Sequence, residues 1–345
     1  NSGAIRREYT LPRNVQEITE AESEPARSML EDDDQTYVAA AATTEEDLEQ
    51  VAPRVPVEVC QAVEADLATL DEDYQAWISK DPNRPRLRLL GPVKLTAYGD
   101  MTEVADRVGF YTELAAYLAS KSRYGATTDE VVEAFGYENK NRVRVDMTIL
   151  RDWLGTNPAT GRPFLPNAPD APAKKEHGKN VYQLDTGPGG VIVDTTLFEQ
   201  KKARAQSRGE AGMTDLREAL TLVDGVPYSM LRETGWTWML ESLNSDRLDN
   251  IATRMISDSA HILTTHYLTQ GAIKDAYAVA KVGILAAPDE QTMQFNLARV
   301  MKAEGRIDEA EKMLNEIVNR SDDGLAPRDL SERSRKIIST WKATG

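Results

Sequence analysis

The C-terminal third of the chain contains a short sequence that occurs twice, 34 residues apart. The two copies are Gly271-Ala272-Ile273-Lys274-Asp275-Ala276 and Gly305-Arg306-Ile307-Asp308-Glu309-Ala310, and Leu263 repeats at the same offset as Leu297. We predict that each glycine lies where one helix ends and the chain must turn. We also predict that each alanine lies where two helices approach too closely for a larger side chain.

This period is typical of the tetratricopeptide repeat, in which each repeat is a pair of helices. One such pair cannot bury its apolar face alone, so neighbouring pairs stack and present a concave surface to another molecule. The sequence therefore predicts two stacked helical hairpins over residues 259–319. The groove of these repeats is the expected site for a protein partner, and homodimer formation is an alternative.

Length and composition limit the class of protein. The chain has 345 residues, enough for two or three domains, and 41% of them are hydrophobic. No run of about 18 apolar residues is present, so we expect no insertion of this chain into a membrane. The single cysteine, Cys60, excludes an internal disulfide and favours a reducing, cytoplasmic location. Because the chain begins with Asn1 rather than Met, we expect it to be a piece of a longer protein.

The net charge of -15 belongs almost entirely to the N-terminal segment. Residues 1–82 carry 6 Lys or Arg against 20 Asp or Glu, whereas residues 83–200 carry 15 of each. Runs such as Glu31-Asp32-Asp33-Asp34 are typical of solvated linkers and of interaction arms. We predict that residues 1–82 form an acidic arm or linker with one amphipathic helix over 57–79. The segment is either a solvated linker or an arm that covers a basic surface and inhibits DNA binding.

Residues 84–194 have the pattern of a winged helix-turn-helix, which is an α+β arrangement. The expected elements are, in order, a strand at 86–95 bent at Gly91-Pro92, three helices around 110–118, 128–135 and 140–154, a loop at 156–180, and a hairpin whose strands at 181–184 and 191–193 flank a glycine-rich tip. Thr127 and Glu130 are a capping signal for the second helix. Everything after residue 194 is expected to be helical.

Short motifs in this region resemble a known family. The first set is Leu90-Gly91-Pro92-Val93, Leu150-Arg151-Asp152-Trp153-Leu154-Gly155 and Tyr182-Gln183-Leu184. They resemble actinobacterial antibiotic regulatory proteins, in which a winged helix precedes a bacterial transcriptional activator domain of tetratricopeptide-like repeats. The second set is Trp153-Leu154-Gly155-Thr156-Asn157-Pro158, Pro163-Phe164-Leu165-Pro166 and Trp236-Thr237-Trp238. These are similar to the C-terminal cytoplasmic part of large actinobacterial membrane proteins that carry a LysM domain.

The resemblance implies DNA binding by the helix at 140–154 and by the wing at 179–192. The side chains expected to contact DNA are Lys140, Asn141, Arg142, Arg144, Thr148, Arg151, Lys179 and Asn180. Two positions depart from the family pattern, because Ile149 and Asp152 stand where members usually carry basic residues. Since phosphate neutralisation supplies much of DNA affinity, Asp152 opposes binding. A helix face adapted to protein contact is therefore kept as an alternative.

Other motifs do not indicate a catalytic or metal site. The glycine-rich segment at 187–190 lacks the lysine and hydroxyl residue of a phosphate-binding loop. His261 and His266 are five residues apart, not the four that would place two ligands on one helix face. We therefore expect neither an enzyme, nor a metal, nor a cofactor.

The sequence thus predicts a mainly α protein with three parts. These are the acidic arm (1–82), the winged helix-turn-helix (84–194) and an all-helical repeat domain of the transcriptional activator type (195–345). The predicted function is DNA-binding transcriptional regulation, with protein interaction or oligomerisation through the repeats. The alternative is a protein-interaction module that does not bind DNA and forms the cytoplasmic part of a membrane assembly.

Overall fold

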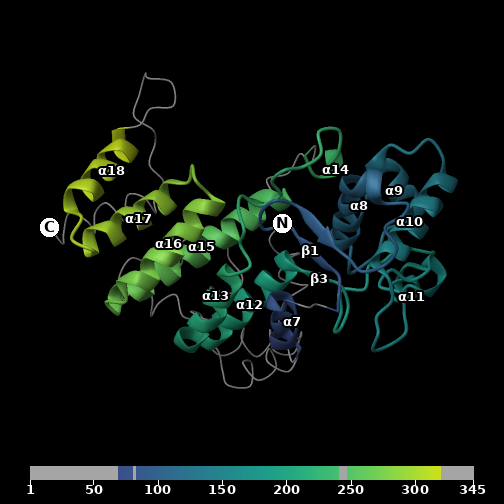
Figure 1. Cartoon of the computed structure of the whole chain (residues 1–345), viewed down its shortest axis with the longest axis horizontal. Coiled ribbons are helices and arrows are strands. Elements are labelled where there is room, and N and C mark those ends of the chain that lie inside the picture. The colour runs from purple at the N-terminus through teal and green to yellow at the C-terminus, as the bar shows by residue number, and fades with distance from the viewer. Residues whose placement is uncertain (1–68, 81–82, 241–246, 320–345) are drawn as a thin grey trace, which may run out of the picture. The chain divides into compact units, whose positions relative to one another are not determined.

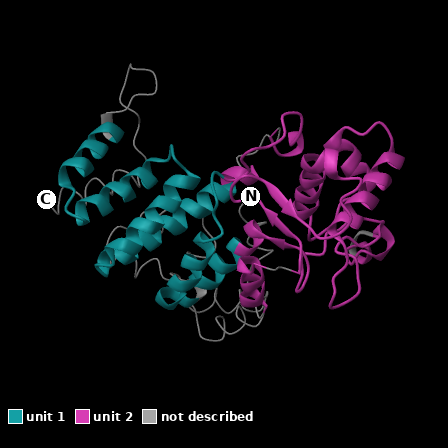
Figure 2. Ribbon diagram, in the orientation of Figure 1, with its two compact units in different colours: residues 1–68, 198–226, 251–345 teal, residues 69–197, 227–250 magenta. Residues whose placement is uncertain are grey.

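The structure is a computed structural model that describes residues 69–80, 83–240 and 247–319 (Figure 1). It divides into two units, which Figure 2 shows in different colours. Among the described residues, unit 2 contains 69–197 and 227–250, and unit 1 contains 198–226 and the residues from 251 onward. The predicted boundary after residue 194 is close to this division, but residues 227–250 return to unit 2. Most of the predicted acidic arm lies outside the described residues.

Unit 2 contains a three-stranded sheet in the order β2-β1-β3. β1 (Arg86–Arg88) pairs antiparallel with β2 (Lys94–Thr96) and parallel with β3 (Ile192–Val193). Leu87 lies opposite Leu95, and both are buried, so this face of the sheet belongs to the core. The single bent strand predicted at 86–95 is instead a hairpin with Gly91-Pro92 in its turn.

Several helices accompany this sheet in unit 2. They are α7 (Leu70–Ile78), the short η1 (Ala105–Arg107), α8 (Val108–Ser120), α9 (Thr128–Phe135), α10 (Lys140–Leu154) and α14 (Thr237–Leu240). One of them, α8, packs against β1 and β2. α7 is the described end of the helix predicted at 57–79. The capping signal is confirmed, because the Thr127 hydroxyl accepts from the Glu130 N–H while the Glu130 carboxylate accepts from the Thr127 N–H. The third predicted helix is confirmed with its bounds unchanged.

The segment after α10 is a long connection with two short helical turns, η2 (Ala168–Asp170) and α11 (Lys174–His177). The hairpin predicted at its end is wrong in its pairing. Tyr182 pairs antiparallel with Ala126, and Ile192–Val193 pairs parallel with β1. The tip still turns, since the Val191 N–H donates to the Asp185 carbonyl at 2.7 Å. The flanking runs bond to other parts of unit 2, so no two-stranded wing forms between them.

Residues 227–240 cross back onto unit 2 and are fixed by a buried carboxylate. Glu113 on α8 is 1% exposed and accepts from Arg232 Nε at 2.5 Å, from the Trp236 N–H at 2.5 Å and from Trp238 Nε1 at 3.2 Å. Trp236 and Trp238 then join an aromatic cluster with Tyr117 and Tyr228. Tyr228 and Trp236 are buried, so they belong to the core of unit 2.

Unit 1 begins within α12 (Asp194–Arg208), which η3 (Gly209–Gly212) and α13 (Met213–Leu220) follow. Buried ion pairs join α12 to α13. Arg204 donates to both oxygens of Asp215, at 2.5 and 3.0 Å, and Lys201 pairs with Asp215 at 3.4 Å. Because Lys201 is fully buried, this pairing compensates a charge that would otherwise be costly in the interior.

The repeats consist of α15 (Leu248–Thr269), α16 (Ile273–Ala286), α17 (Gln291–Ala303) and α18 (Ile307–Asn319). The two predicted turns have the same backbone hydrogen bonds. Gly271 has a φ of 69°, its N–H donates to Leu268, and the next N–H donates to Tyr267. Gly305 has a φ of 84°, its N–H donates to Lys302, and the next N–H donates to Met301. Both are Schellman motifs, which favour glycine because of its positive φ.

The predicted close approaches are also present in the repeats. Ala276 and Ala310 are fully buried. A methyl group placed on Gly283 of α16 would lie 2.4 Å from the Met293 sulfur of α17 and 3.2 Å from the Ala260 methyl of α15. α16 therefore packs against both neighbours, as stacked hairpins require. Among the described helices, none has the length and apolar character needed to cross a membrane.

Candidate functional site

Two features are candidates for function: the polar contact between α15 and α17 in unit 1, and the exposed face of α10 in unit 2. In the first, His261 Nδ1 lies 2.8 Å from Asn296 Oδ1, and both residues are fully buried. Arg299 Nη1 donates to Thr265 Oγ1 at 3.0 Å and lies 3.5 Å from Asn296 Oδ1. Thr265 and Arg299 occupy equivalent positions, 34 residues apart, in the two repeats.

One face of α15 is polar although it is buried. Its buried polar side chains are Ser257, Asp258, His261, Thr264 and Thr265. These residues recur at helical spacing, so they form a continuous stripe along the helix. Within the described part of the chain, Ser257 Oγ and Thr264 Oγ1 have no hydrogen-bond partner, so only part of the stripe is matched by polar neighbours. His261 is buried in the repeat core, while His266 is half-buried and its pKa is lowered by burial.

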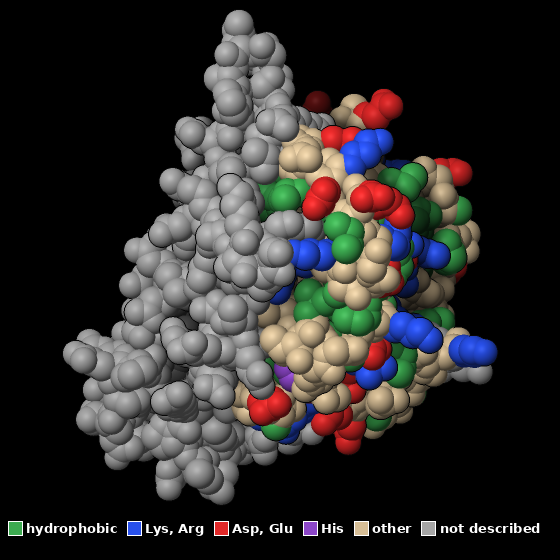
Figure 3. Space-filling view, turned by 90° about the vertical axis from the view of Figure 1, so that its left-hand side faces the viewer, with side chains coloured by type: hydrophobic (Ala, Val, Ile, Leu, Met, Phe, Trp, Pro, Cys, Tyr) green, Lys and Arg blue, Asp and Glu red, His purple; other side chains and the backbone are tan. Residues whose placement is uncertain are grey.

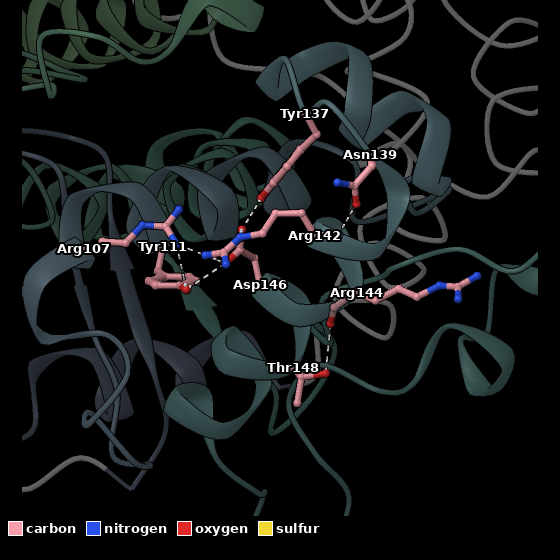
Figure 4. Close-up of polar contacts among 8 residues, drawn as sticks. All are labelled: Arg107, Tyr111, Tyr137, Asn139, Arg142, Arg144, Asp146 and Thr148. Carbon is pink, nitrogen blue, oxygen red and sulfur yellow. Dashed lines mark hydrogen bonds and ion pairs between the residues drawn. The ribbon is translucent and has the colours of Figure 1, made fainter.

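The second candidate, α10, is anchored through a buried carboxylate. Asp146 is 0% exposed and accepts from four side chains, which Figure 4 shows converging on it. Tyr111 and Tyr137 donate their hydroxyls at 2.9 Å each. Arg142 donates through Nε at 3.1 Å and Nη2 at 2.9 Å, and Arg107 donates at 3.2 Å. This Asp146 cluster joins the end of η1, α8, the segment just after α9, and α10.

The cluster changes the acidity of its phenols. Burial raises the pKa of Tyr111 to about 12, and the hydrogen bond to Asp146 adds to the increase. Burial and the Asp146 charge also raise the pKa of Tyr137. The carboxylate raises the pKa of Arg142 further. Both phenols therefore remain neutral donors at physiological pH.

The structure assigns different environments to the predicted DNA-binding residues of α10. Arg142 is held by Asp146, and Lys140 forms an exposed ion pair with Asp129. Arg151 donates to the backbone carbonyls of Leu165 and Pro166, at 2.7 and 3.3 Å, and burial lowers its pKa. It therefore positions the long connection after α10.

The remaining predicted contacts stay exposed. They are Asn141, Arg144 and Thr148 on α10, and Lys179 and Asn180 after α11. In Figure 4 the Arg144 side chain points away from the Asp146 cluster. The Thr148 hydroxyl donates to the Arg144 carbonyl at 3.0 Å. Val145, which is 48% exposed, and Asp152 lie on the same helix. On the exposed surface of α10, Arg144 is thus a cation that extends into solvent, between polar and apolar side chains.

The visible surface has no dominant charge. In the face that Figure 3 draws, acidic and basic side chains are interspersed among the described residues. A shallow hollow on α18 is lined by Asp308, Glu311, Lys312, Asn315 and Glu316. Neither surface resembles the continuous basic stripe that marks a nucleic-acid interface.

Comparison with known proteins gives one family match. A model of the tetratricopeptide repeat matches residues 267–328, which include α16, α17 and α18. The search of curated proteins found no significant match. The repeat architecture predicted from the 34-residue period is therefore confirmed at this level. The resemblance to winged-helix regulators and to LysM-containing membrane proteins stays a prediction.

Sequence reasoning missed two groups of residues at these sites. Asp146 was overlooked because it lies beside the apolar stripe of α10, yet Arg142 stands four residues before it, at a spacing typical of helical ion pairs. The Asn296 and Arg299 contacts were also missed. The 34-residue offset did indicate a contact for Arg299, because Thr265 is its equivalent in the preceding repeat and equivalent positions of stacked hairpins lie close together.

Proposed function

We propose that this chain is a protein-interaction module whose partner binds the tetratricopeptide hairpins. The observation that carries the proposal is the pair of identical turns at Gly271 and Gly305, which join α15 to α16 and α17 to α18 and lie within the residues that the repeat family matches. Stacked hairpins of this kind act by presenting an extended surface. The proposal includes no catalytic step, metal or cofactor, and it places the chain in the cytoplasm because Cys60 is its single cysteine.

Site-specific photocrosslinking tests this proposal. A photoreactive residue is introduced at exposed positions of the repeats, Lys274 and Lys281, and at exposed control positions of unit 2, Lys121 and Arg123. We expect defined products from the repeat positions and few from the controls. A crosslinked dimer of this chain would identify the partner as a second copy. Equal labelling of all four positions would contradict the proposal.

DNA binding is the second candidate, and the exposed polar face of α10 favours it. Asn141, Arg144 and Thr148 are available to bases or phosphates, whereas Arg142 and Arg151 already bond within the protein. The small number of available cations predicts weak binding with a shallow dependence on salt. In this candidate the acidic segment competes with DNA for the same cations.

A salt series of DNA binding separates the candidates. Arg144→Ala should reduce the slope of log K against log salt by about 0.9, the value for one lost phosphate contact. The control Arg123→Ala, on an exposed residue outside α10, should leave the slope unchanged. If the acidic segment is inhibitory, its removal should raise the affinity for DNA most at low salt. Deletion of residues 1–68 is preferred to deletion of residues 1–82, because the longer deletion would also remove α7 from unit 2.

A further inference from the structure

The outer face of the β1–β2 hairpin carries a group of cations that neither proposed function uses. In the register of these strands, Arg88 lies directly opposite Lys94, and Arg86 lies opposite Thr96. Side chains alternate along a strand, so these four residues share one face while Leu87 and Leu95 occupy the other. Like charges directly opposite each other destabilise a hairpin. The Arg88–Lys94 pair therefore favours negative charge close to this face.

A pocket of about 280 Å³ opens over this face. The C-terminal end of α7 forms one of its walls through Trp77, and Tyr98 lies on the β2 side. Four of its lining residues are cations, namely Lys80, Arg86, Arg88 and Lys94, and none of the described residues that line it is acidic. The volume is near the lower end of ligand pockets, about 300 Å³, which suits a small molecule.

Two of the cations have fixed positions. Arg86 donates to the Trp77 carbonyl at 2.5 Å and to the Ser79 carbonyl at 2.7 Å, which holds α7 against the hairpin. Its Nε is buried without a hydrogen-bond partner among the described residues. The Arg88 guanidinium lies 5.9 Å from the centre of the Trp77 ring. A ligand would therefore meet a partly ordered set of donors and would not need to order all of them on binding.

The local electrostatics also favour an anion. Burial lowers the pKa of Arg86, the charge of Arg88 lowers it further, and Tyr98 opposes both effects. The charge of Arg88 also opposes the rise in the pKa of the buried Asp194 carboxyl, whose oxygens accept from the backbone N–H groups of Leu89 and Leu90. A phosphate between Arg88 and Lys94 would reduce the repulsion between these two side chains.

The two aromatic residues have different roles. Trp77 is 7% exposed and is already covered by Arg88, so its ring forms part of the wall. Tyr98 is 50% exposed at the rim, where its ring can pack against a planar group. We propose that this pocket binds a phosphate monoester that carries a planar ring, of the size of a mononucleotide. The phosphate lies between Arg88 and Lys94, with further donors from Arg86 and Thr96, and the ring lies against Tyr98.

Calorimetric titration of the full chain with adenosine monophosphate, inorganic phosphate and adenosine tests this proposal. We expect saturable binding of adenosine monophosphate, weaker binding of phosphate and no measurable binding of adenosine. Lys94→Glu should weaken both phosphate ligands by roughly 10-fold or more, as expected for loss of a charge-assisted hydrogen bond. The matched control Lys121→Glu changes an exposed lysine of the same unit by the same charge and should bind like the parent chain. Tyr98→Ala should weaken adenosine monophosphate and leave phosphate unchanged.

Thermal unfolding without ligand gives a second readout. Lys94→Glu should raise the melting temperature, because it replaces a like-charge pair across the hairpin by an opposite-charge pair. The site assignment is overturned if adenosine monophosphate and phosphate do not bind, or if Lys94→Glu and Lys121→Glu bind them equally. Equal effects of Tyr98→Ala on both ligands would overturn the role given to the ring. These outcomes do not depend on whether a protein partner binds the repeats.

Discussion

Removal of the Asp146 carboxylate should destabilise unit 2 more than any other single polar truncation on α10. The carboxylate is fully buried and accepts five hydrogen bonds from four side chains. In Asp146→Ala, the hydroxyl of Tyr111 stays in the interior without an acceptor, which costs about 1–3 kcal/mol, and that of Tyr137 adds a similar or smaller amount. The side chains of Arg107 and Arg142 are 38% and 49% exposed, so water replaces much of what they lose.

The total loss expected for Asp146→Ala is about 3–5 kcal/mol, the range for breaking a buried, paired charge. The assay is urea unfolding followed by tryptophan fluorescence. Four of the five tryptophans, Trp77, Trp153, Trp236 and Trp238, belong to unit 2, so Trp341→Phe serves as the parent background and the signal then reports on the unit that contains the cluster.

Two comparisons make the result interpretable. Asp152→Ala removes an exposed carboxylate from the same helix and should change stability by no more than about 0.5 kcal/mol. Tyr111→Phe combined with Asp146→Ala should cost less than the sum of the single changes, because the phenol no longer needs an acceptor. A loss below about 1 kcal/mol for Asp146→Ala, or one equal to that of Asp152→Ala, would refute this reasoning.

Four further predictions address other elements. Gly305→Ala should lower the free energy of unfolding by about 1–2 kcal/mol, and Gly305→Asn should lower it less, as measured by loss of helical circular dichroism. The loss comes from the φ of 84°, since a Cβ at this position would meet no atom within 4 Å. Ala310→Leu should cost roughly 1–3 kcal/mol through overpacking, whereas Leu at the exposed Ala303 should be tolerated. The pKa of Tyr111 is about 12 in the folded protein and about 10 in the unfolded chain. This difference adds to the free energy of unfolding fully below pH 10, and the addition is lost as pH rises through 12. Tyr111→Phe should therefore flatten that part of a plot of the free energy of unfolding against pH. Burial raises the pKa of Asp194 to about 7. The contribution of this shift to the free energy of unfolding is complete below about pH 4 and is lost as pH rises through 7. If the free energy of unfolding has the same slope against pH over that interval in Asp194→Asn as in the parent chain, the assignment is contradicted.

The sequence by itself determined the elements whose signals are local. The offset between Gly271 and Gly305 predicted both turns, because a Schellman motif needs a positive φ that glycine adopts without strain. The Thr127–Glu130 capping box fixed the start of α9, and the periodic apolar residues fixed α10. Each of these signals lies within a few residues of the element that it specifies, so it can be interpreted without the rest of the fold.

The tertiary structure alone decided which distant residues meet. Residues 181–184 and 191–193 have strand-like sequences, but their backbone partners are Ala126 and β1, which no local pattern indicates. Arg151 looks like an available cation in the sequence, yet it donates to the Leu165 carbonyl, and the buried Asp146 carboxylate accepts from Arg107 and Tyr111, which are 39 and 35 residues away in the chain. Strand pairing and the pairing of buried charges depend on contacts between residues far apart in the chain. These contacts form only when the surrounding core has excluded water, so the sequence pattern of one segment cannot specify them.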